Sequence, residues 1–366
     1  MLALLGACTP HAQTPKADST APPETVEERR YAFNVPTGFE GPWIEFATAE
    51  HGYGMFTKCG PSWCEAMLFS TEDGGRSWKG RTHPQPVAKN QQLYVANATT
   101  LVLLSEPDAW YISRDGAATW RRQRYQEGNL PPEYPRGAGT GPYYVDCGPA
   151  YDGPCFIKNR DRDASWRSEL PAGAGTTLTN APGPRIWLAG LRDGEPVTHV
   201  SEIGHTGLHE VSVPRQDGRK LANARVVISA DGKDTWLIGD QEPSSGGGGS
   251  GKMRGSVVKA TGLPLIWQLL NNVWVPRPTT AIKENPTWPY SVAPAGDGLL
   301  VLVGPEGAGY FQREWDLIGG LGELDWIGQT ADGTLTGRSN SNSHAVFLST
   351  GNGRDRNWIK VMPSRQ

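Results

Sequence analysis

One eight-residue phrase recurs along this chain, and its spacing limits the folds that the chain can adopt. The phrase reads TEDGGRSW at 71–78, SRDGAATW at 113–120 and NRDRDASW at 159–166. Its central aspartates lie 42 and 46 residues apart. A repeat of this length is typical of a β-propeller, in which each blade is a four-stranded sheet of about 40 to 50 residues.

The residue types in the phrase suit a tight turn followed by a packed aromatic side chain. An aspartate in a turn accepts hydrogen bonds from backbone N–H groups of that turn, and glycine adopts the left-handed conformation that such turns need. A tryptophan just after the turn buries a large apolar surface against neighbouring structure. The residues expected to hold these turns are Asp73, Trp78, Asp115, Trp120, Asp161 and Trp166.

The phrase resembles the Asp box, SxDxGxTW, of the BNR-repeat propellers. In that family the turn lies between the third and fourth strands of a blade and is structural rather than catalytic. The resemblance therefore implies an all-β propeller of the sialidase-like superfamily, in which these aspartates hold the fold together.

Weaker copies of the turn fix the expected number of blades. They lie in segments that start at 201, 258, 309 and 349, and with the three phrases they give seven units at steps of 42 to 58 residues. We therefore expect a single propeller domain over residues 31–366 with seven four-stranded blades. Because four of the copies are degenerate, six and eight blades remain alternatives.

Two further patterns bear on the order of strands. SADGKDTW at 229–236 also fits the phrase, but it follows the fourth copy by only 28 residues. We assign Asp231 instead to a hairpin between first and second strands, like the turns near 49, 295 and 331. YAFNVP at 31–36 and WIKVMP at 358–363 both read as outer strands that end at proline, and they compete to complete the last blade.

Composition excludes several other classes of protein. With 46 Gly and 30 Pro, no window of 11 to 18 residues keeps a helical apolar period without one of them, which excludes a helical bundle or coiled coil. The net charge of −3 comes with no basic face, so we expect no nucleic-acid partner. No stretch of 18 apolar residues is present, so we expect no membrane span.

The first eight residues, MLALLGAC, are apolar and end in small residues before Cys8. They resemble part of a bacterial lipobox, which implies cleavage before Cys8 and a lipid on its thiol; the alternative is an ordinary apolar terminus. Residues 9–30 are rich in Pro, Thr and Glu and are expected to form a flexible tether. The predicted location is the bacterial cell envelope, with the membrane as a partner through the lipid anchor.

The other four cysteines form two close pairs, Cys59 with Cys64 and Cys147 with Cys155. Each pair is expected to form a disulfide that closes a small loop, and such bonds persist in oxidising compartments. The spacing does not fit a zinc site, and we expect neither metal nor cofactor. The nearest cluster of histidines is read as strand and turn residues: His199, His205 and His209.

Propeller topology gives the two sides of the ring different properties. First-to-second and third-to-fourth strand turns share one side, called here the turn face; the second-to-third connections and the links between blades share the other, the link face. The link face receives the irregular segments, including 240–255, whose glycine-rich part 244–251 is either natural or an engineered replacement. Variable loops on a rigid scaffold collect binding residues, so we expect a glycan or protein ligand there. The candidate ligand-binding residues are Trp63, Tyr151, Asp152, Asp193, Asp240, Glu242, Trp288 and Tyr290.

An enzymatic function has less support in the sequence. Sialidases share the Asp box and carry an Arg-Ile-Pro motif before the first box, but residues 31–69 contain no Arg, and Arg185-Ile186-Trp187 is the only fragment of the motif. The chain also resembles the BNR-like propeller lipoproteins that assist photosystem II assembly, through AEHGYG at 49–54 followed by the first box. Those proteins are non-enzymatic scaffolds. We therefore expect a monomeric, non-catalytic binding or scaffold module without catalytic residues; the alternative is a sialidase-like glycoside hydrolase or lyase acting on extracellular polysaccharide.

Overall fold

The regular structure of the chain consists of β-strands. A computed structural model contains 27 strands, β1 to β27, and no helix in the residues it describes. These residues are 26–125, 130–134, 143–146, 156–159, 174–182, 185–202, 207–216, 220–242, 262–280, 282, 285, 290–339 and 344–365.

Five sheets have four antiparallel strands in sequence order. The first two comprise β2 (Glu40–Phe46), β3 (Gly52–Cys59), β4 (Cys64–Thr71) and β5 (Lys79–Arg81), then β6 (Asn90–Val95), β7 (Leu101–Glu106), β8 (Ala109–Ser113) and β9 (Arg121–Arg124). The next two comprise β12 (Ala174–Asn180), β13 (Arg185–Arg192), β14 (Glu195–Glu202) and β15 (His209–Val211), then β16 (Leu221–Ile228), β17 (Thr235–Gln241), β18 (Leu265–Leu270) and β19 (Val273–Pro276). The fifth comprises β20 (Ser291–Gly296), β21 (Leu299–Gly304), β22 (Gly307–Phe311) and β23 (Trp315–Leu317).

Two sheets depart from this pattern. One contains β10 (Tyr143–Asp146) and β11 (Phe156–Asn159). The last sheet has five strands in the order β1-β27-β26-β25-β24. Its strands are β1 (Glu27–Phe33), β24 (Trp326–Gln329), β25 (Leu335–Arg338), β26 (Val346–Thr350) and β27 (Asn357–Arg365).

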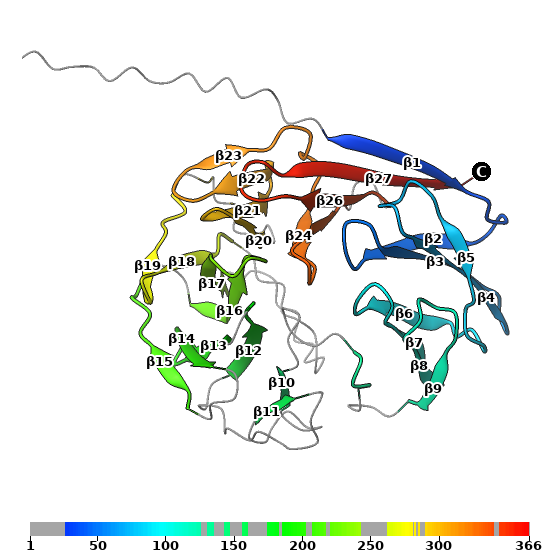
Figure 1. The fold of residues 1–366 in the computed structure, drawn as a ribbon, viewed down its shortest axis with the longest axis horizontal. Coiled ribbons are helices and arrows are strands. Elements are labelled where there is room, and N and C mark those ends of the chain that lie inside the picture. Colours follow the sequence, from blue (N-terminus) through cyan, green and yellow to red (C-terminus); the bar gives the residue numbers. More distant parts are fainter. Residues whose placement is uncertain are drawn as a thin grey trace, which may run out of the picture.

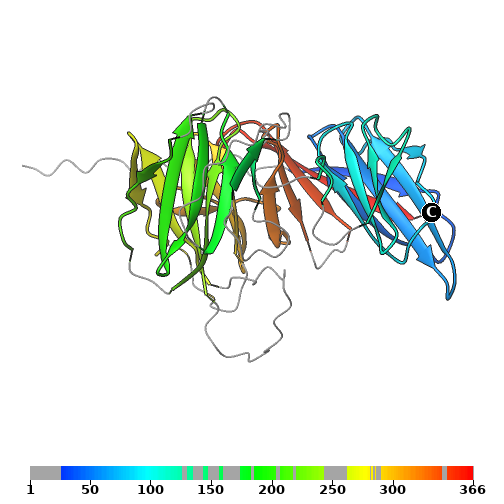
Figure 2. The same cartoon turned by 90° about the horizontal axis from the view of Figure 1, so that it is seen from below.

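The sheets stand around a common centre (Figure 1). In the five four-stranded sheets the first strand is nearest to the centre and the fourth is at the periphery, and in the last sheet β24 is innermost and β1 outermost. Seen from the side, the strands run roughly along the axis of the ring (Figure 2). This arrangement is a β-propeller and confirms the predicted fold class. The expected count of seven blades stays a prediction, because only two strands of the β10–β11 sheet lie in the described residues.

The last sheet joins the two ends of the chain. The WIKVMP segment lies in β27 and takes the fourth position. The first half of YAFNVP ends β1, which adds a fifth strand parallel to β27, from Glu27 beside Ile359 to Phe33 beside Arg365. The two segments therefore both complete this sheet. Because β1 begins at Glu27, the end of the predicted tether at residue 30 lies inside the propeller.

The core lies in the layers between neighbouring sheets. Tyr310 of one sheet packs with Phe347 and Trp358 of the next, and all three side chains are almost fully buried. At the junction of the last and first sheets, Phe33 contacts Phe56 and Trp78 edge-on or tilted. Tryptophans near the third-to-fourth strand turns thus act mainly as packing between sheets.

The two described copies of the repeated phrase form turns of the same geometry between third and fourth strands. Asp73 Oδ1 accepts hydrogen bonds from Thr71 Oγ1 at 2.8 Å and Ser77 N at 2.9 Å. Asp115 Oδ1 accepts from Ser113 Oγ at 2.8 Å and Thr119 N at 2.9 Å. The third phrase lies outside the described residues from residue 160 on, including Asp161 and Trp166.

These hydrogen bonds favour the ionised form of Asp73 and of Asp115 over the protonated form. Partial burial acts to raise the pKa of Asp73, but hydrogen bonds, above all from Ser77, outweigh it and lower that pKa to about 2. Hydrogen bonds from the Thr119 side chain and backbone lower the pKa of Asp115 to about 2 as well.

The first-to-second strand hairpins lie where the sequence predicts them. Asp231 lies between β16 and β17, and the turns near 49, 295 and 331 have the same position in their sheets. The prediction of a third-to-fourth strand turn in the segment that starts at 258 is wrong. The apolar residues of this segment form β18, the third strand, and the turn comes later, at Asn271 and Asn272, which both have positive φ. The Asn-Asn pair replaces the Asp-Gly signal there, because asparagine also tolerates the left-handed conformation.

Within the described ranges, no helix is long and apolar enough to cross a membrane.

Candidate binding site

A pocket of about 410 Å³ opens on the link face between the sheets β12–β15 and β16–β19. One wall is the turn from Asp193 to Pro196, and the other is the link that carries Arg215, Gln216 and Lys220. Leu221, Leu265 and Trp267 also line it. We call this cavity the link-face pocket, and it contains one of the predicted ligand-binding residues, Asp193.

The turn at Asp193 is fixed by its backbone conformation. Asp193 and Gly194 have φ of 56° and 80°, and they connect Arg192 to Glu195, which face each other across β13 and β14. Two successive positive φ values define the hairpin turn in which Asp-Gly is a preferred pair. A Cβ on Gly194 would lie 3.1 Å from Cε of Lys220, so the glycine also lets the lysine stem lie across the turn.

The rim carries charges of both signs. Arg215 Nη2 lies 3.0 Å from Glu195 Oε1, and both side chains are largely exposed. Lys220 Nζ lies 3.9 Å from Glu242 Oε1, and the backbone N–H of Glu242 donates to the Lys220 carbonyl at 2.8 Å. Glu242 is therefore held next to the pocket.

Buried residues beneath the rim are hydrogen-bonded to the link. Trp267 is 1% exposed, and its indole N–H donates to the Pro214 carbonyl at 2.8 Å. The Gln216 amide donates to the Ile266 carbonyl at 2.7 Å. These two bonds fix the link above an apolar floor of Leu221 and Trp267.

The other described candidates lie apart from this pocket or beside it. Asp240, near the end of β17, forms an ion pair with Arg225. Tyr290 precedes β20; its hydroxyl accepts a hydrogen bond from the Asn285 N–H at 3.0 Å, and its ring is half-buried against the core. Three candidates lie outside the described residues: Tyr151, Asp152 and Trp288.

Several pocket residues were not among the sequence-based candidates, namely Glu195, Arg215, Gln216 and Lys220. The polar stretch PRQDGRK at 214–220, between the EVSVP strand and the next strand, was the available signal. Its position opposite the Asp193 turn depends on how two sheets pack, which local sequence does not specify.

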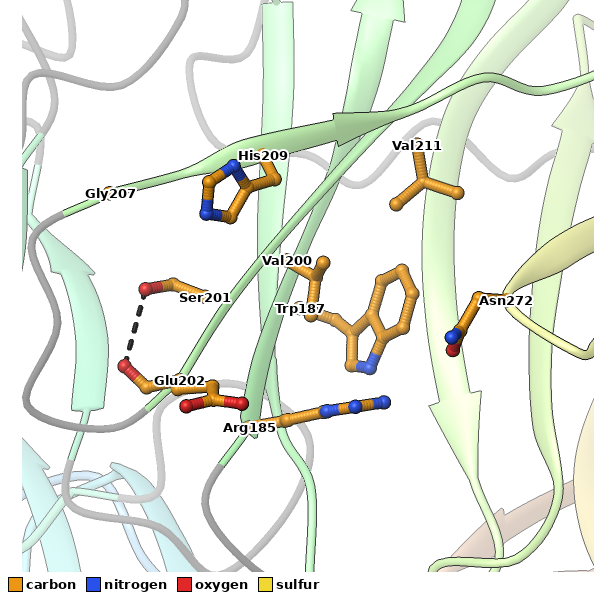
Figure 3. A pocket seen from close by; sticks show the side chains of 9 residues that line it. All are labelled: Arg185, Trp187, Val200, Ser201, Glu202, Gly207, His209, Val211 and Asn272. Carbon is orange, nitrogen blue, oxygen red and sulfur yellow. Dashed lines mark hydrogen bonds between the residues drawn. The ribbon is translucent and has the colours of Figure 1, made fainter.

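A second pocket, of about 420 Å³, opens on the turn face (Figure 3). Trp187, Val200 and Val211 give it an apolar wall, and Arg185, Glu202 and His209 surround them. Arg185 belongs to the sequence fragment compared with the sialidase motif. The other basic group lining the pocket is His209 of β15, so among the described residues the pocket has no arginine triad.

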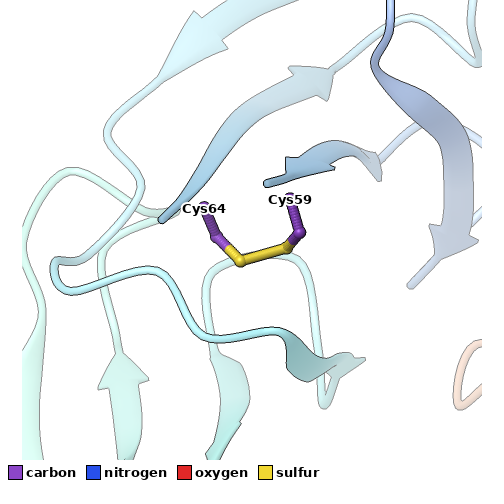
Figure 4. Close-up of a disulfide and its surroundings, with 2 residues drawn as sticks. All are labelled: Cys59 and Cys64. Atoms are coloured by element: carbon purple, nitrogen blue, oxygen red, sulfur yellow. A yellow bond between two sulfur atoms is a disulfide. The ribbon is translucent and has the colours of Figure 1, made fainter. Parts of the chain in front are cut away.

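The predicted disulfide between Cys59 and Cys64 is present at the tip of the β3–β4 hairpin (Figure 4). Trp63 beside it is 47% exposed, and Lys58 Nζ lies 5.7 Å from the centre of its ring. A Cβ on Gly60 would lie 2.8 Å from the indole nitrogen, so one face of the ring packs on the hairpin. Trp63 is thus an exposed aromatic group on the link face, on a different sheet from the link-face pocket. Cys8, Cys147 and Cys155 lie outside the described residues.

The described residues contain no group of three or more His, Cys, Asp or Glu side chains that could hold a metal ion.

Comparisons with known proteins give no family. The chain matches no family model and no curated protein. Solved structures similar to it include YCF48 bound to D1 peptide, at 14% identity and TM-score 0.42 over 86% of this chain and 97% of that one. TolB from Acinetobacter baumannii is similar at 15% identity and TM-score 0.36, over 81% and 63%. The GH93 α-L-arabinofuranosidase of Fusarium graminearum with arabinobiose is similar at 11% identity and TM-score 0.32, over 92% and 96%. The strand order in its sheets establishes that this chain is a β-propeller.

Proposed function

We propose that this chain is a non-catalytic binding module of the bacterial cell envelope that holds a segment of another protein in its link-face pocket. The observation that carries the proposal is the combination of an apolar floor with a rim of both charges. Glu195 and Arg215 lie on opposite walls, and Lys220 lies near Glu242. A polypeptide presents apolar side chains together with charges of both signs, which suits this rim better than a neutral glycan does.

The rim charges are available to a partner at low cost. Arg215 and Glu195 are 81% and 49% exposed, and exposed ion pairs contribute about 0 to 1 kcal/mol to stability. A partner that supplies opposite charges can therefore replace these contacts without unfolding the rim.

The hydrolase alternative needs two carboxylates that face each other across a pocket. In the described part of the link-face pocket, the lining carboxylates Asp193 and Glu195 lie on the same turn, and Asp240 pairs with Arg225 outside it. This arrangement supports binding over hydrolysis. A screen of the full chain on sialosides and common polysaccharides tests the alternative: turnover that disappears in Asp240→Asn would support hydrolysis and contradict a non-catalytic module.

The envelope location and the BNR relationship are part of the same proposal. A lipid on Cys8 and a tether of the following residues would hold the propeller at a membrane. The Cys59–Cys64 disulfide supports an oxidising compartment. The turns at Asp73 and Asp115, which have the same hydrogen bonds, support membership of the Asp-box propellers.

Site-specific photocrosslinking in the native host tests the partner and the surface together. We expect p-benzoylphenylalanine at Glu242 to give a defined protein adduct, and the double variant Arg215→Glu, Lys220→Glu to abolish it. The matched control is Lys79→Glu with Arg124→Glu, which reverses two charges on the outer strands β5 and β9. An adduct that survives the pocket variant, or is lost equally in the control, would contradict the proposed surface.

A further inference from the structure

A third pocket lies where the innermost strands of three sheets meet. It measures about 280 Å³ and is lined by Glu45 of β2, Val95 of β6, Trp326 and Gln329 of β24, and Arg338 of β25. β2, β6 and β24 are the strands nearest the centre of the ring in their sheets (Figure 1). Glu45, Val95 and Gln329 lie at or near the strand ends that lead into turn-face hairpins, so this central pocket is separate from the link-face pocket.

Trp326 gives the central pocket an aromatic surface. Its side chain is 47% exposed although it lies on an inner strand. A Cβ on Gly328 would lie 2.5 Å from the six-membered ring of the indole. The glycine therefore lets the ring lie against the strand, with its other face available to a ligand.

Glu45 and Arg338 form a neutral pair beside this ring. Arg338 Nη2 lies 3.4 Å from Glu45 Oε1 and donates to the Ile44 carbonyl at 3.2 Å. The Val95 N–H donates to Glu45 Oε2 at 3.2 Å. Both Arg338 contacts use one nitrogen, and among the described residues Nε and Nη1 have no partner, so donors remain for a ligand.

We propose that the central pocket binds one ring of a neutral oligosaccharide. A sugar ring has an apolar face of C–H groups that can stack on Trp326, and hydroxyl groups at its edge that accept from Arg338 and donate to Glu45. A charged ligand is disfavoured, because Glu45 repels anions and Arg338 repels cations. The volume is close to the lower limit of small-molecule sites, about 300 Å³, and so suits a single ring.

Calorimetric titration of the full chain tests this site with four probes: cellohexaose, laminarihexaose, maltohexaose and chitohexaose. We expect at least one to bind, and we expect Trp326→Ala and Gly328→Val each to weaken binding about tenfold or more. The control is Leu317→Ala, which removes an exposed apolar side chain from the outer strand β23 and leaves affinity unchanged.

Two results would overturn the glycan site: no binding of any of the four probes, or affinities in Trp326→Ala equal to those of the wild type. The Glu242 crosslink to a protein partner is expected to persist in Trp326→Ala. Failure of the glycan site and failure of the proposed function are therefore distinguishable.

Discussion

At the scale of single residues, Asp73 and Asp115 hold their turns together because each carboxylate accepts several hydrogen bonds. Asp73 receives both the backbone N–H and the side-chain hydroxyl of Ser77, at 2.9 and 2.5 Å. Thr71 completes the set and also accepts from the Gly75 N–H at 2.9 Å. The carboxylate thus replaces the regular backbone bonds that a turn cannot make.

Replacing Asp73 by Asn is expected to lower the free energy of unfolding by about 2 kcal/mol at pH 7, because hydrogen bonds to a charged acceptor are lost. The folded-state pKa, about 2, lies below the ordinary value near 3.8, so the ionised group stabilises the fold above that value. This stabilisation is lost as pH falls from about 4 through 2. Urea titrations of both proteins at pH 7, 4 and 2.5 measure the difference, which should shrink at the lowest pH.

Glu65→Gln is the control for the Asp73 prediction, since it removes one exposed carboxylate from the same sheet. A constant difference between wild type and Asp73→Asn over this pH range would show that the charge of Asp73 does not contribute.

At the scale of elements, the parallel strand β1 connects the last sheet to the first. It pairs with β27 over its whole length, and Phe33 at its end is fully buried. Arg29 reaches the first sheet, where its guanidinium donates to the Gly74 carbonyl at 2.9 Å. Without β1, the edge of β27 would be unpaired and the aromatic cluster around Phe33 would be open.

Deleting residues 1–33 is therefore expected to lower the melting temperature and to promote aggregation through the edge of β27. Phe33→Ala alone should cost about 3 to 5 kcal/mol, the usual range for a buried phenylalanine. Calorimetry and size-exclusion chromatography measure both effects. Deletion of residues 1–25 is the control and should leave the melting temperature unchanged; an equal loss in both deletions would contradict a role for β1.

At the scale of the whole molecule, the sequence predicts the architecture better than the site. The repeated phrase, the Asp-Gly hairpins and the terminal strands are local patterns. The phrases at Asp73 and Asp115, the hairpins and the terminal strands have the predicted positions in their sheets. The misplaced copy that starts at 258 shows the limit of local patterns, since the turn of its sheet uses Asn271 and Asn272 rather than Asp-Gly.

The sites depend on contacts between distant segments, which one sequence does not reveal. Asp193 was predictable as a loop carboxylate, but Lys220 joins it only through the packing of two sheets. Trp326 looks like any strand tryptophan until the fold places it beside Arg338 in the lining of a central pocket.

The lipid anchor is a property of the whole chain and can be tested on it. In Triton X-114 phase separation of bacterial extracts, we expect the full chain to enter the detergent phase and Cys8→Ala to remain in the aqueous phase, because acyl chains gain about 0.8 kcal/mol per buried methylene. Aqueous partition of both proteins would contradict lipidation.

The parallel pairing of β1 with β27 also has a mechanical consequence. A pull on the chain before Glu27, directed along the strand, would load all seven paired positions in shear at the same time, rather than separate them one after another. A propeller held at its N-terminus would thereby be attached through a strand pair that resists force well. Tension on a bound partner would pass through the last sheet to the ring before β1 separates from β27.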